Sequence, residues 1–189
     1  AGIVFRRLFK KIASPEIFFY AVFLFSFSFE GFRVFLLFIE LGMPLYLGIL
    51  FSRIVIFGRF FGLMAIFLSS LYALEIKYQN FGTLLGGALV LSLMIAYLVP
   101  IDSSVILSQL MYKPGDELSI FIANISLGFF AIVNFLVAAI KRNIRFFYII
   151  IASLLILLGR ELFLFIAGPA TGSTGLVCLF IGTFLFYRQ

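Results

Sequence analysis

Two adjacent charged residues, Arg160 and Glu161, lie inside an apolar stretch of the chain and are the side chains best suited to chemistry. A charged side chain at membrane depth costs at least about 2.5–3.5 kcal/mol, so it usually faces a partner, a ligand or a water-filled cavity. Neighbouring helical positions point about 100° apart, which predicts that each residue finds its own partner on another helix. The two residues therefore indicate an ion-pair, ligand or proton site.

Glu40 and Glu30 are the expected partners, because both are acidic residues within or beside apolar segments. A pair between Arg160 and Glu40 would neutralise two buried charges. Glu30 and Arg33 are three residues apart, which places them on one face of a helix. Two interpretations stay open, a structural salt bridge that fixes helix packing and a site for a ligand, an ion or a proton. Both predict that removing one partner alone is harmful.

Arg53 and Arg59 are six residues apart, and they are expected to bracket a tight connection or to lie on a kinked helix. Basic residues near the ends of membrane segments anchor lipid headgroups, so these two are candidates for headgroup or small-anion contacts. Two small-xxx-small patterns, which allow close helix approach, make four glycines candidates for helix packing: Gly58, Gly62, Gly82 and Gly86.

The sequence offers little for catalysis. It has no His, which removes the usual haem ligand, the commonest zinc ligand and the commonest general base, and it has a single Cys. The motifs of nucleotide binding and of serine or zinc hydrolases are not found. Asp102, Asp116 and Glu117 are interpreted as helix-capping residues, because their spacing matches no recognised metal site. We therefore expect no metal, no cofactor and no catalytic residue.

The elements that position these residues are membrane helices. Hydrophobic residues make up 64% of the 189 residues, and the mean hydropathy is +1.24. A soluble domain contains about 45–50% apolar residues, because it needs a polar surface. This chain has too little polar surface to coat itself, which indicates that its outside faces lipid. The predicted fold class is an all-α, polytopic integral membrane helical bundle that forms a single domain over residues 1–189.

Seven apolar segments can be distinguished, at residues 16–29, 34–52, 54–75, 83–100, 118–140, 146–167 and 174–187. A span needs about 20 residues, with a range of about 17–25, so the first and last segments are short. Residues 1–14 carry basic side chains opposite an apolar face, the pattern of a helix lying in the membrane interface. Residues 101–117 form the longest extramembrane loop, in which 105–111 could be a short surface helix. A second connection, at 168–175, is rich in Gly.

The positive-inside rule discriminates between topologies. With seven spans, one of the two main basic clusters always lies outside. If segment 16–29 enters the membrane without crossing, only Arg53, Arg59 and Lys113 lie outside. We therefore predict six spans plus an N-terminal interfacial or re-entrant segment, with seven spans and the N-terminus outside as the alternative. Both topologies place the C-terminus in the cytoplasm, and the expected location is the cytoplasmic membrane of a prokaryote.

The favoured function is a non-catalytic membrane domain, a sensor, a receptor or an assembly module, which binds a ligand or partner from the outer side. A chain that stops just after an apolar segment is compatible with a longer protein in which an output domain follows. The alternative is a small transporter or channel that uses Arg160, Glu161 and Glu40 as its substrate or proton site. A membrane enzyme that modifies lipid is the least favoured function.

The net charge of +6 is interpreted as a membrane signal rather than a nucleic-acid signal. Basic residues cluster at the ends of apolar segments, where they would meet anionic headgroups. The residues expected to contact headgroups are Arg6, Arg7, Lys10, Lys11, Lys141, Arg142 and Arg145. Besides the bilayer, the Gly-rich helix faces are compatible with a homo-oligomer or a larger membrane complex.

Overall fold

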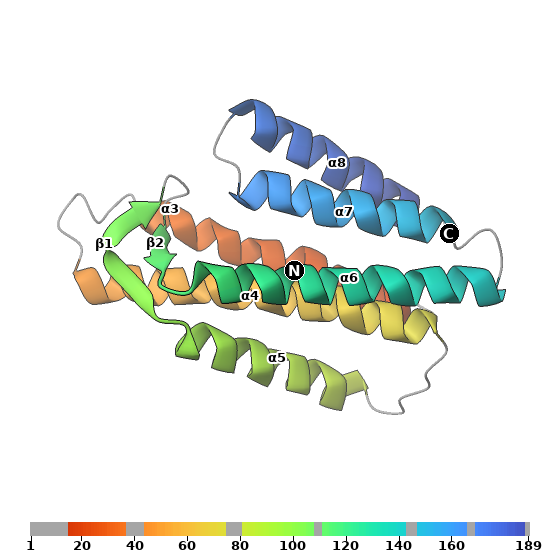
Figure 1. Cartoon of the computed structure of the whole chain (residues 1–189), viewed down its shortest axis with the longest axis horizontal. Coiled ribbons are helices and arrows are strands. Elements are labelled where there is room, and N and C mark those ends of the chain that lie inside the picture. Colours follow the sequence, from red (N-terminus) through yellow and green to blue (C-terminus); the bar gives the residue numbers. More distant parts are fainter. Residues whose placement is uncertain are drawn as a thin grey trace, which may run out of the picture.

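Six long helical segments and one small sheet make up the part of the chain that the computed structural model describes, residues 15–36, 44–74, 81–107, 111–142, 147–165 and 169–187. The elements in order are α2 (Pro15–Ser26), the 3₁₀ helix η1 (Phe27–Phe32), α3 (Arg33–Leu36), α4 (Leu45–Ala73), α5 (Phe81–Leu98), β1 (Ile101–Leu107), β2 (Met111–Pro114), α6 (Glu117–Arg142), α7 (Phe147–Phe165) and α8 (Pro169–Tyr187). Helix α4 is central and packs against α2, α5 and α6, while α7 and α8 form a pair at one side (Figure 1).

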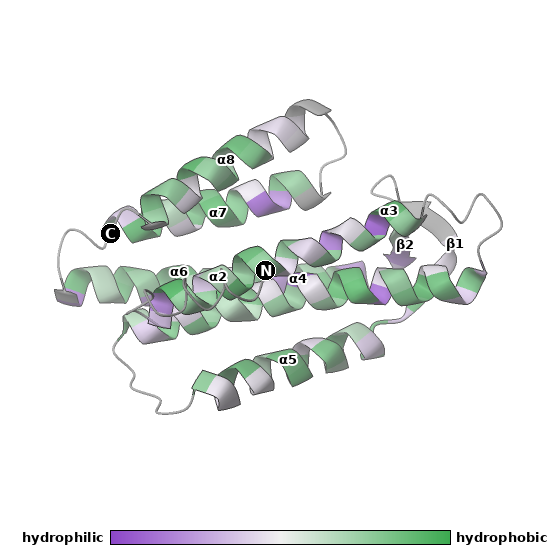
Figure 2. Ribbon diagram, turned by 180° about the vertical axis from the view of Figure 1, so that it is seen from behind, coloured by the Kyte–Doolittle hydropathy of each residue, from purple (hydrophilic) through white to green (hydrophobic). Residues whose placement is uncertain are grey.

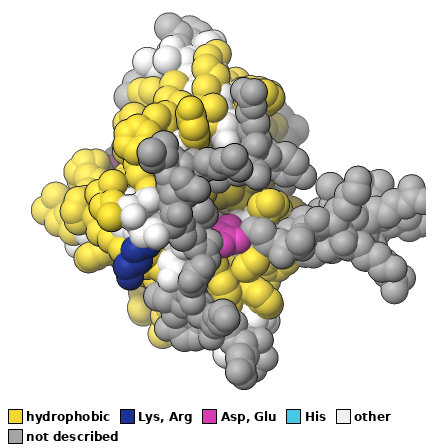
Figure 3. Space-filling model, turned by 90° about the vertical axis from the view of Figure 1, so that its right-hand side faces the viewer, with side chains coloured by type: hydrophobic (Ala, Val, Ile, Leu, Met, Phe, Trp, Pro, Cys, Tyr) yellow, Lys and Arg dark blue, Asp and Glu magenta, His cyan; other side chains and the backbone are white. Residues whose placement is uncertain are grey.

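Four described helices are long and apolar enough to cross a membrane: Pro15–Phe35, Leu45–Ala73, Phe81–Leu98 and Glu117–Lys141. Apolar residues cover most of each long helix (Figure 2), and large side chains such as Ile140 and Phe180 lie on the outside, 78% and 76% exposed. Figure 3 shows the end of the bundle opposite the hairpin, where the described side chains are mostly hydrophobic and the described charged ones occupy small areas. The predicted architecture, a helical integral membrane protein with several spans, is confirmed. The exact number of spans stays a prediction.

Helix α4 is one continuous element, so the predicted division into segments 34–52 and 54–75 is wrong. The helix runs through Arg53 and Arg59 over 29 residues. An Arg inside an apolar run lowers the local hydropathy, but it is a good helix former, so it marks no helix boundary. At 1.5 Å per residue α4 is about 44 Å long. It is therefore longer than the hydrocarbon core of a bilayer is thick, which is about 30 Å.

The N-terminal segment stays helical across the whole of residues 15–36, with a 3₁₀ stretch in its middle. Pro15 is its first helical residue, a position where the missing N–H is not needed. At the change from α2 to η1, the buried Ser26 hydroxyl donates a hydrogen bond to the Phe23 carbonyl at 2.6 Å, and such bonds compete with the regular helical pattern. The 21-residue stretch Pro15–Phe35 has the length of a full span, which a re-entrant segment does not need.

Residues 101–107 and 111–114 form a two-stranded antiparallel sheet, so the expected short helix at 105–111 is wrong. Strand β1 pairs with β2 in the register Ile101↔Pro114, Asp102↔Lys113, Ile106↔Tyr112 and Leu107↔Met111, with an irregularity between Asp102 and Ile106. The β-branched Val105 and Ile106 favour a strand over a helix. The Tyr112 N–H donates to the Ser52 hydroxyl oxygen at 3.1 Å, which attaches the hairpin to α4.

The Gly-rich stretch 168–175, expected as a connection, belongs largely to α8, which begins at Pro169. Helices α7 and α8 approach each other at Gly residues that the sequence patterns did not single out. A Cβ on Gly159 would lie 2.8 Å from the Gly175 carbonyl oxygen, and one on Gly182 would lie 2.7 Å from Ile156 Cγ1. Since no side chain fits at these positions, glycine is what permits this close packing.

A hydrogen bond between side chains connects α2 to α8. The hydroxyl oxygens of Tyr20 and Thr183 are 2.7 Å apart. Because the Thr183 hydroxyl donates to the Leu179 carbonyl at 2.7 Å, Tyr20 is the donor to Thr183. The Tyr20 ring also stacks on Phe186, with the ring centroids 4.2 Å apart. The hydroxyl therefore adds a specific contact to a packed aromatic pair.

We expect Tyr20→Phe to lower the free energy of unfolding by about 0.6 kcal/mol, and by at most about 1.7 kcal/mol, because it removes one interhelical hydrogen bond and keeps the ring. The measurement is equilibrium unfolding in mixed detergent micelles, followed by circular dichroism. Thr183→Val added to Tyr20→Phe should then cost less than Thr183→Val alone costs in the wild type. Additive losses would show that the two hydroxyls do not interact.

Candidate functional site

A buried group of charged residues connects three segments of the bundle. Arg59 Nε in α4 donates to Glu30 Oε1 in η1 at 3.0 Å. The other Glu30 oxygen, Oε2, pairs with Arg33 Nε at 2.5 Å. The three side chains are only 7% (Arg59), 12% (Glu30) and 15% (Arg33) exposed. The Glu30 carboxylate therefore contacts two guanidinium groups at a place that is largely shielded from solvent. Together with Arg160 and Glu161 of α7, we call these residues the ionic layer.

Arg160 is the largest fully buried side chain described, with 2% exposure. Its Nη1 donates to Glu161 Oε1 at 2.6 Å, so the prediction that these neighbours do not pair is wrong. The long, flexible Arg side chain bridges the angle between adjacent helical positions. Its Nη2 does reach another helix, where it donates to the Arg59 backbone carbonyl at 3.1 Å. Glu40, the other expected partner, lies outside the described residues.

Arg53 occupies a different level from the ionic layer, beside the β-hairpin. Its Cζ lies 5.1 Å from the centroid of the Tyr97 ring, at the end of α5. Tyr97 is 71% exposed, and Tyr and Arg are both enriched at membrane–water interfaces. Headgroup contact therefore stays a prediction for Arg53, whereas Arg59 is buried against Glu30.

Asn124 and Arg160 lie one to two helical turns from the ends of α6 and α7 that are next to the hairpin, whereas α4 begins 14 residues, about 21 Å, before Arg59. Arg59 follows Arg53 by six residues, or about 9 Å along α4. Asn124 is seven residues, about 10 Å, from the start of α6, and Arg160 is five residues, about 8 Å, from the end of α7. Figure 1 shows these helix ends on the side of the hairpin. The buried polar groups of α4, α6 and α7 thus lie at similar depths.

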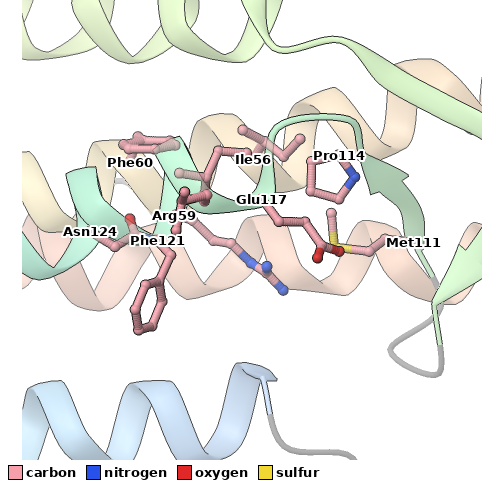
Figure 4. Close-up of a pocket in the computed structure, with 10 residues that line it drawn as sticks. Ile56, Arg59, Phe60, Met111, Pro114, Glu117, Phe121 and Asn124 are labelled. Carbon is pink, nitrogen blue, oxygen red and sulfur yellow. The ribbon is translucent and has the colours of Figure 1, made fainter.

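A cavity of about 520 Å³ lies between α4, α6 and β2, next to the ionic layer (Figure 4). Its lining residues are Ile56, Arg59, Phe60, Met111, Pro114, Glu117, Leu118, Ile120, Phe121 and Asn124. Two of its polar residues, Arg59 and Asn124, are each only 8% exposed. Within the described part of the chain, Asn124 Oδ1 has no hydrogen-bond partner. Apolar walls with a few placed polar groups are typical of small-molecule sites.

The acidic residues around the hairpin serve as local hydrogen-bond acceptors. Asp116 Oδ1 accepts from the Ser119 N–H at 3.1 Å and caps α6, as predicted. Asp102 Oδ1 accepts from the hydroxyl and the N–H of Ser104, at 2.6 and 2.9 Å, inside β1 instead of at a helix end. These hydrogen bonds lower the pKa of each of the two carboxyl groups below the ordinary value for Asp. In the ranges that the structure covers, no three His, Cys, Asp or Glu residues are grouped to hold a metal ion.

The two glycine patterns differ in their surroundings. A Cβ on Gly58 would collide with Phe29, and one on Gly62 would collide with Ser26, so both glycines lie directly against the N-terminal segment. This close approach brings Arg59 within reach of Glu30. Gly82 and Gly86 have no described atom within 4 Å of the place of a Cβ, and the helix packing expected for them is not observed.

Comparison of the chain with protein-family models, with curated proteins and with solved structures found no match. The functional argument therefore uses the geometry of the site. The charged members of the ionic layer were identifiable from sequence, because each charge lies within or directly beside an apolar segment. The cavity was not identifiable, because its apolar lining residues, such as Ile56 and Phe121, resemble the rest of a membrane helix. The unusual polar residue Asn124 was the available signal.

Proposed function

We propose that the chain is a non-catalytic sensor or receptor domain that binds a small ligand in the cavity beside Arg59 and Asn124. The observation that carries the proposal is a buried guanidinium and a buried amide at a cavity of about 520 Å³ with mostly apolar walls. Ligand sites commonly have volumes of about 300–1,000 Å³. Buried polar atoms normally have hydrogen-bond partners, so a ligand atom next to Asn124 Oδ1 would complete the site.

We further infer six crossings, by residues 15–36, α4, α5, α6, α7 and α8. Because α4 replaces two predicted segments, the N-terminal segment can cross without changing the sides of the later loops. The basic residues at 6–11, 77, 141–145 and 188 then fall on one side, and Lys113 is the one basic residue in the connections on the other side. The positive-inside rule makes the first side cytoplasmic. The hairpin and the cavity then face outward, in the cytoplasmic membrane of a prokaryote.

The distribution of charge favours binding over transport. In the described helices, no Asp, Glu, Lys or Arg lies between the ionic layer and the last turn at the opposite end. The charges therefore form a layer across the bundle and not a path along it. A transporter or channel that uses Arg160 and Glu161 needs a polar path through that uncharged part, so we rank transport second.

Native mass spectrometry of the protein extracted in mild detergent tests the binding function. We expect the wild type to retain a bound small molecule, and the double variant Ile56→Phe/Asn124→Leu, which fills the cavity and removes its amide, to lose at least about tenfold in occupancy, or about 1.4 kcal/mol. The control Leu154→Phe adds the same ring on the outer surface of α7, where Leu154 is 39% exposed, and should retain the molecule.

Two results would contradict the proposed function. One is a wild-type protein that carries no bound molecule even after incubation with a membrane extract. The other is a solute flux in proteoliposomes that disappears in Glu161→Gln, which would assign transport instead.

A further inference from the structure

We propose, on the basis of the binding function above, that the ligand is a compact, uncharged, membrane-soluble molecule with one hydroxyl group, such as a phenol or a cyclic alcohol. Its hydroxyl lies against Asn124, its apolar body fills the cavity, and it enters from the bilayer between Leu118 and Phe121. Three observations support this ligand class: the buried amide of Asn124, the apolar walls with their limited volume, and the rim on a membrane helix.

The buried amide of Asn124 determines the chemistry of the polar group. Asn124 lines the cavity and is 8% exposed, and among the residues that the structure describes none donates a hydrogen bond to its Oδ1. An amide carries an acceptor oxygen and a donor NH₂ group, which exchange places after rotation by 180°. A ligand group that both donates and accepts therefore suits either orientation. A carboxylate only accepts and an ammonium only donates, whereas a neutral hydroxyl does both.

The two charged residues of the cavity wall have partners within the protein. Arg59 Nε donates to Glu30 Oε1 at 3.0 Å, and Glu117 Oε1 lies 3.9 Å from Lys113 Nζ. Neither interaction requires the ligand. Buried polar atoms normally have hydrogen-bond partners, so Asn124 is the residue of the wall whose hydrogen bonding a ligand would complete.

The apolar walls of the cavity favour a compact hydrocarbon body. Figure 4 shows Asn124 between Phe60 and Phe121 at one end of the cavity, with Met111 and Pro114 at the other end. The volume of about 520 Å³ corresponds to about 17 units of about 30 Å³, which is the volume of a water molecule in the liquid and roughly that of one CH₂ group. A two-chain membrane lipid is much larger, so a small ring system or a short chain fits this space.

The rim of the cavity is apolar on the side of α6. Leu118 and Phe121 are 68% and 58% exposed, and both lie in a helix with the length and hydropathy of a membrane span. Exposed apolar residues of such a helix face lipid, so the opening between them leads toward hydrocarbon. On the inner wall Ile56 and Phe60 are 3% and 2% exposed and continue the apolar surface. An uncharged molecule therefore keeps apolar surroundings along this route, whereas a charged one would lose its hydration.

The absence of Trp from the chain allows a site-specific test, because one introduced Trp is the sole indole fluorophore. Leu118→Trp places it at the rim of the cavity. Leu98→Trp is the matched control, because it makes the same substitution at a residue outside the cavity lining that is 71% exposed and ends α5 beside the hairpin. The protein is reconstituted in phosphatidylcholine vesicles, and quenching is measured with brominated adamantanes of nearly equal size.

Three probes are compared, and they differ in one substituent. The first is 3-bromo-1-adamantanol, which carries the hydroxyl. The second is 1-bromo-3-methyladamantane, in which a methyl group replaces the hydroxyl. The third is 3-bromoadamantane-1-carboxylate, used at about pH 9, where a membrane-bound carboxylic acid is ionised. The ratio of two probes at Leu98→Trp corrects for their different depths in the bilayer.

After this correction, we expect the hydroxyl probe to reach half-maximal quenching of Leu118→Trp at a mole fraction about tenfold lower than the methyl probe does, which corresponds to about 1.4 kcal/mol. Adding Asn124→Leu to Leu118→Trp should abolish this preference, and the circular dichroism spectrum checks that the double variant is folded. If it does not fold, the comparison of the probes in Leu118→Trp alone decides.

Equal corrected quenching of Leu118→Trp by the hydroxyl and methyl probes would overturn the proposed ligand class. Stronger quenching by the carboxylate would also overturn it, in favour of an anion. A preference that persists in folded Asn124→Leu/Leu118→Trp would overturn the contact with Asn124. If native mass spectrometry shows a bound compound that is charged or lacks a hydroxyl, the receptor function stands and this ligand class fails. If it shows no bound compound, both proposals fail.

Discussion

Glu30→Gln is expected to lower the free energy of unfolding by about 3–5 kcal/mol, because it removes one partner of a buried ion pair and leaves the other charge uncompensated. Here two guanidinium groups lose the same carboxylate, since Glu30 contacts both Arg33 and Arg59. The Glu30 side chain is only 12% exposed, so water compensates little of this loss. The measurement is equilibrium unfolding in mixed detergent micelles, followed by far-ultraviolet circular dichroism.

The matched control is Glu117→Gln, which makes the same chemical change at an exposed pair. Glu117 lies 3.9 Å from Lys113 and its side chain is 53% exposed. Exposed pairs contribute about 0–1 kcal/mol, so this variant should behave almost as the wild type. The double variant Glu30→Gln/Arg59→Gln should lose less than the sum of its single variants. If Glu30→Gln costs no more than Glu117→Gln, the ionic layer does not stabilise the fold.

The residues of the ionic layer could be predicted, because the free-energy cost of placing a charged side chain in a membrane follows from its residue type and not from its partners. Arg160, Glu161 and Glu30 stand out in any apolar stretch. Their partners were not predictable, because pairing depends on how each helix is rotated and how far a side chain reaches. The argument from the 100° helical angle treated side chains as short and rigid, and it failed for Arg160, which reaches both Glu161 and the Arg59 carbonyl.

The fold class could be predicted from the sequence, but the predicted segment boundaries were wrong, and the two outcomes have a related reason. Hydropathy reports where apolar residues are, so it found the helical membrane architecture. Hydropathy cannot distinguish a polar residue at which a helix ends from one that lies inside a continuous helix. This is why α4 was divided near Arg53. The β-branched Val105 and Ile106 favour a strand, but a short apolar run of this kind also suits a short helix. The pairing of β1 with β2 shows that residues 105–107 and 111 lie in strands.

The contact between α7 and α8 gives the second large prediction. A Cβ on Gly175 would lie 2.7 Å from Phe163 N and 2.8 Å from the Gly159 carbonyl oxygen. Both are backbone atoms of α7, so they cannot move aside as a flexible side chain can. Gly175→Val should therefore force α7 and α8 apart. We expect a loss of at least about 1–3 kcal/mol, the usual cost of overpacking a well-packed core.

The control for helix propensity is Gly172→Val, because Gly172 lies one turn earlier in α8 and has no described atom within 4 Å of the place of a Cβ. Val replaces Gly in a helix in both variants, so the change in intrinsic propensity is similar and their difference in unfolding free energy measures the helix contact. Gly159→Val and Gly175→Val disturb the same contact, so the double variant should lose less than the sum. Equal stability of Gly172→Val and Gly175→Val would contradict the close approach.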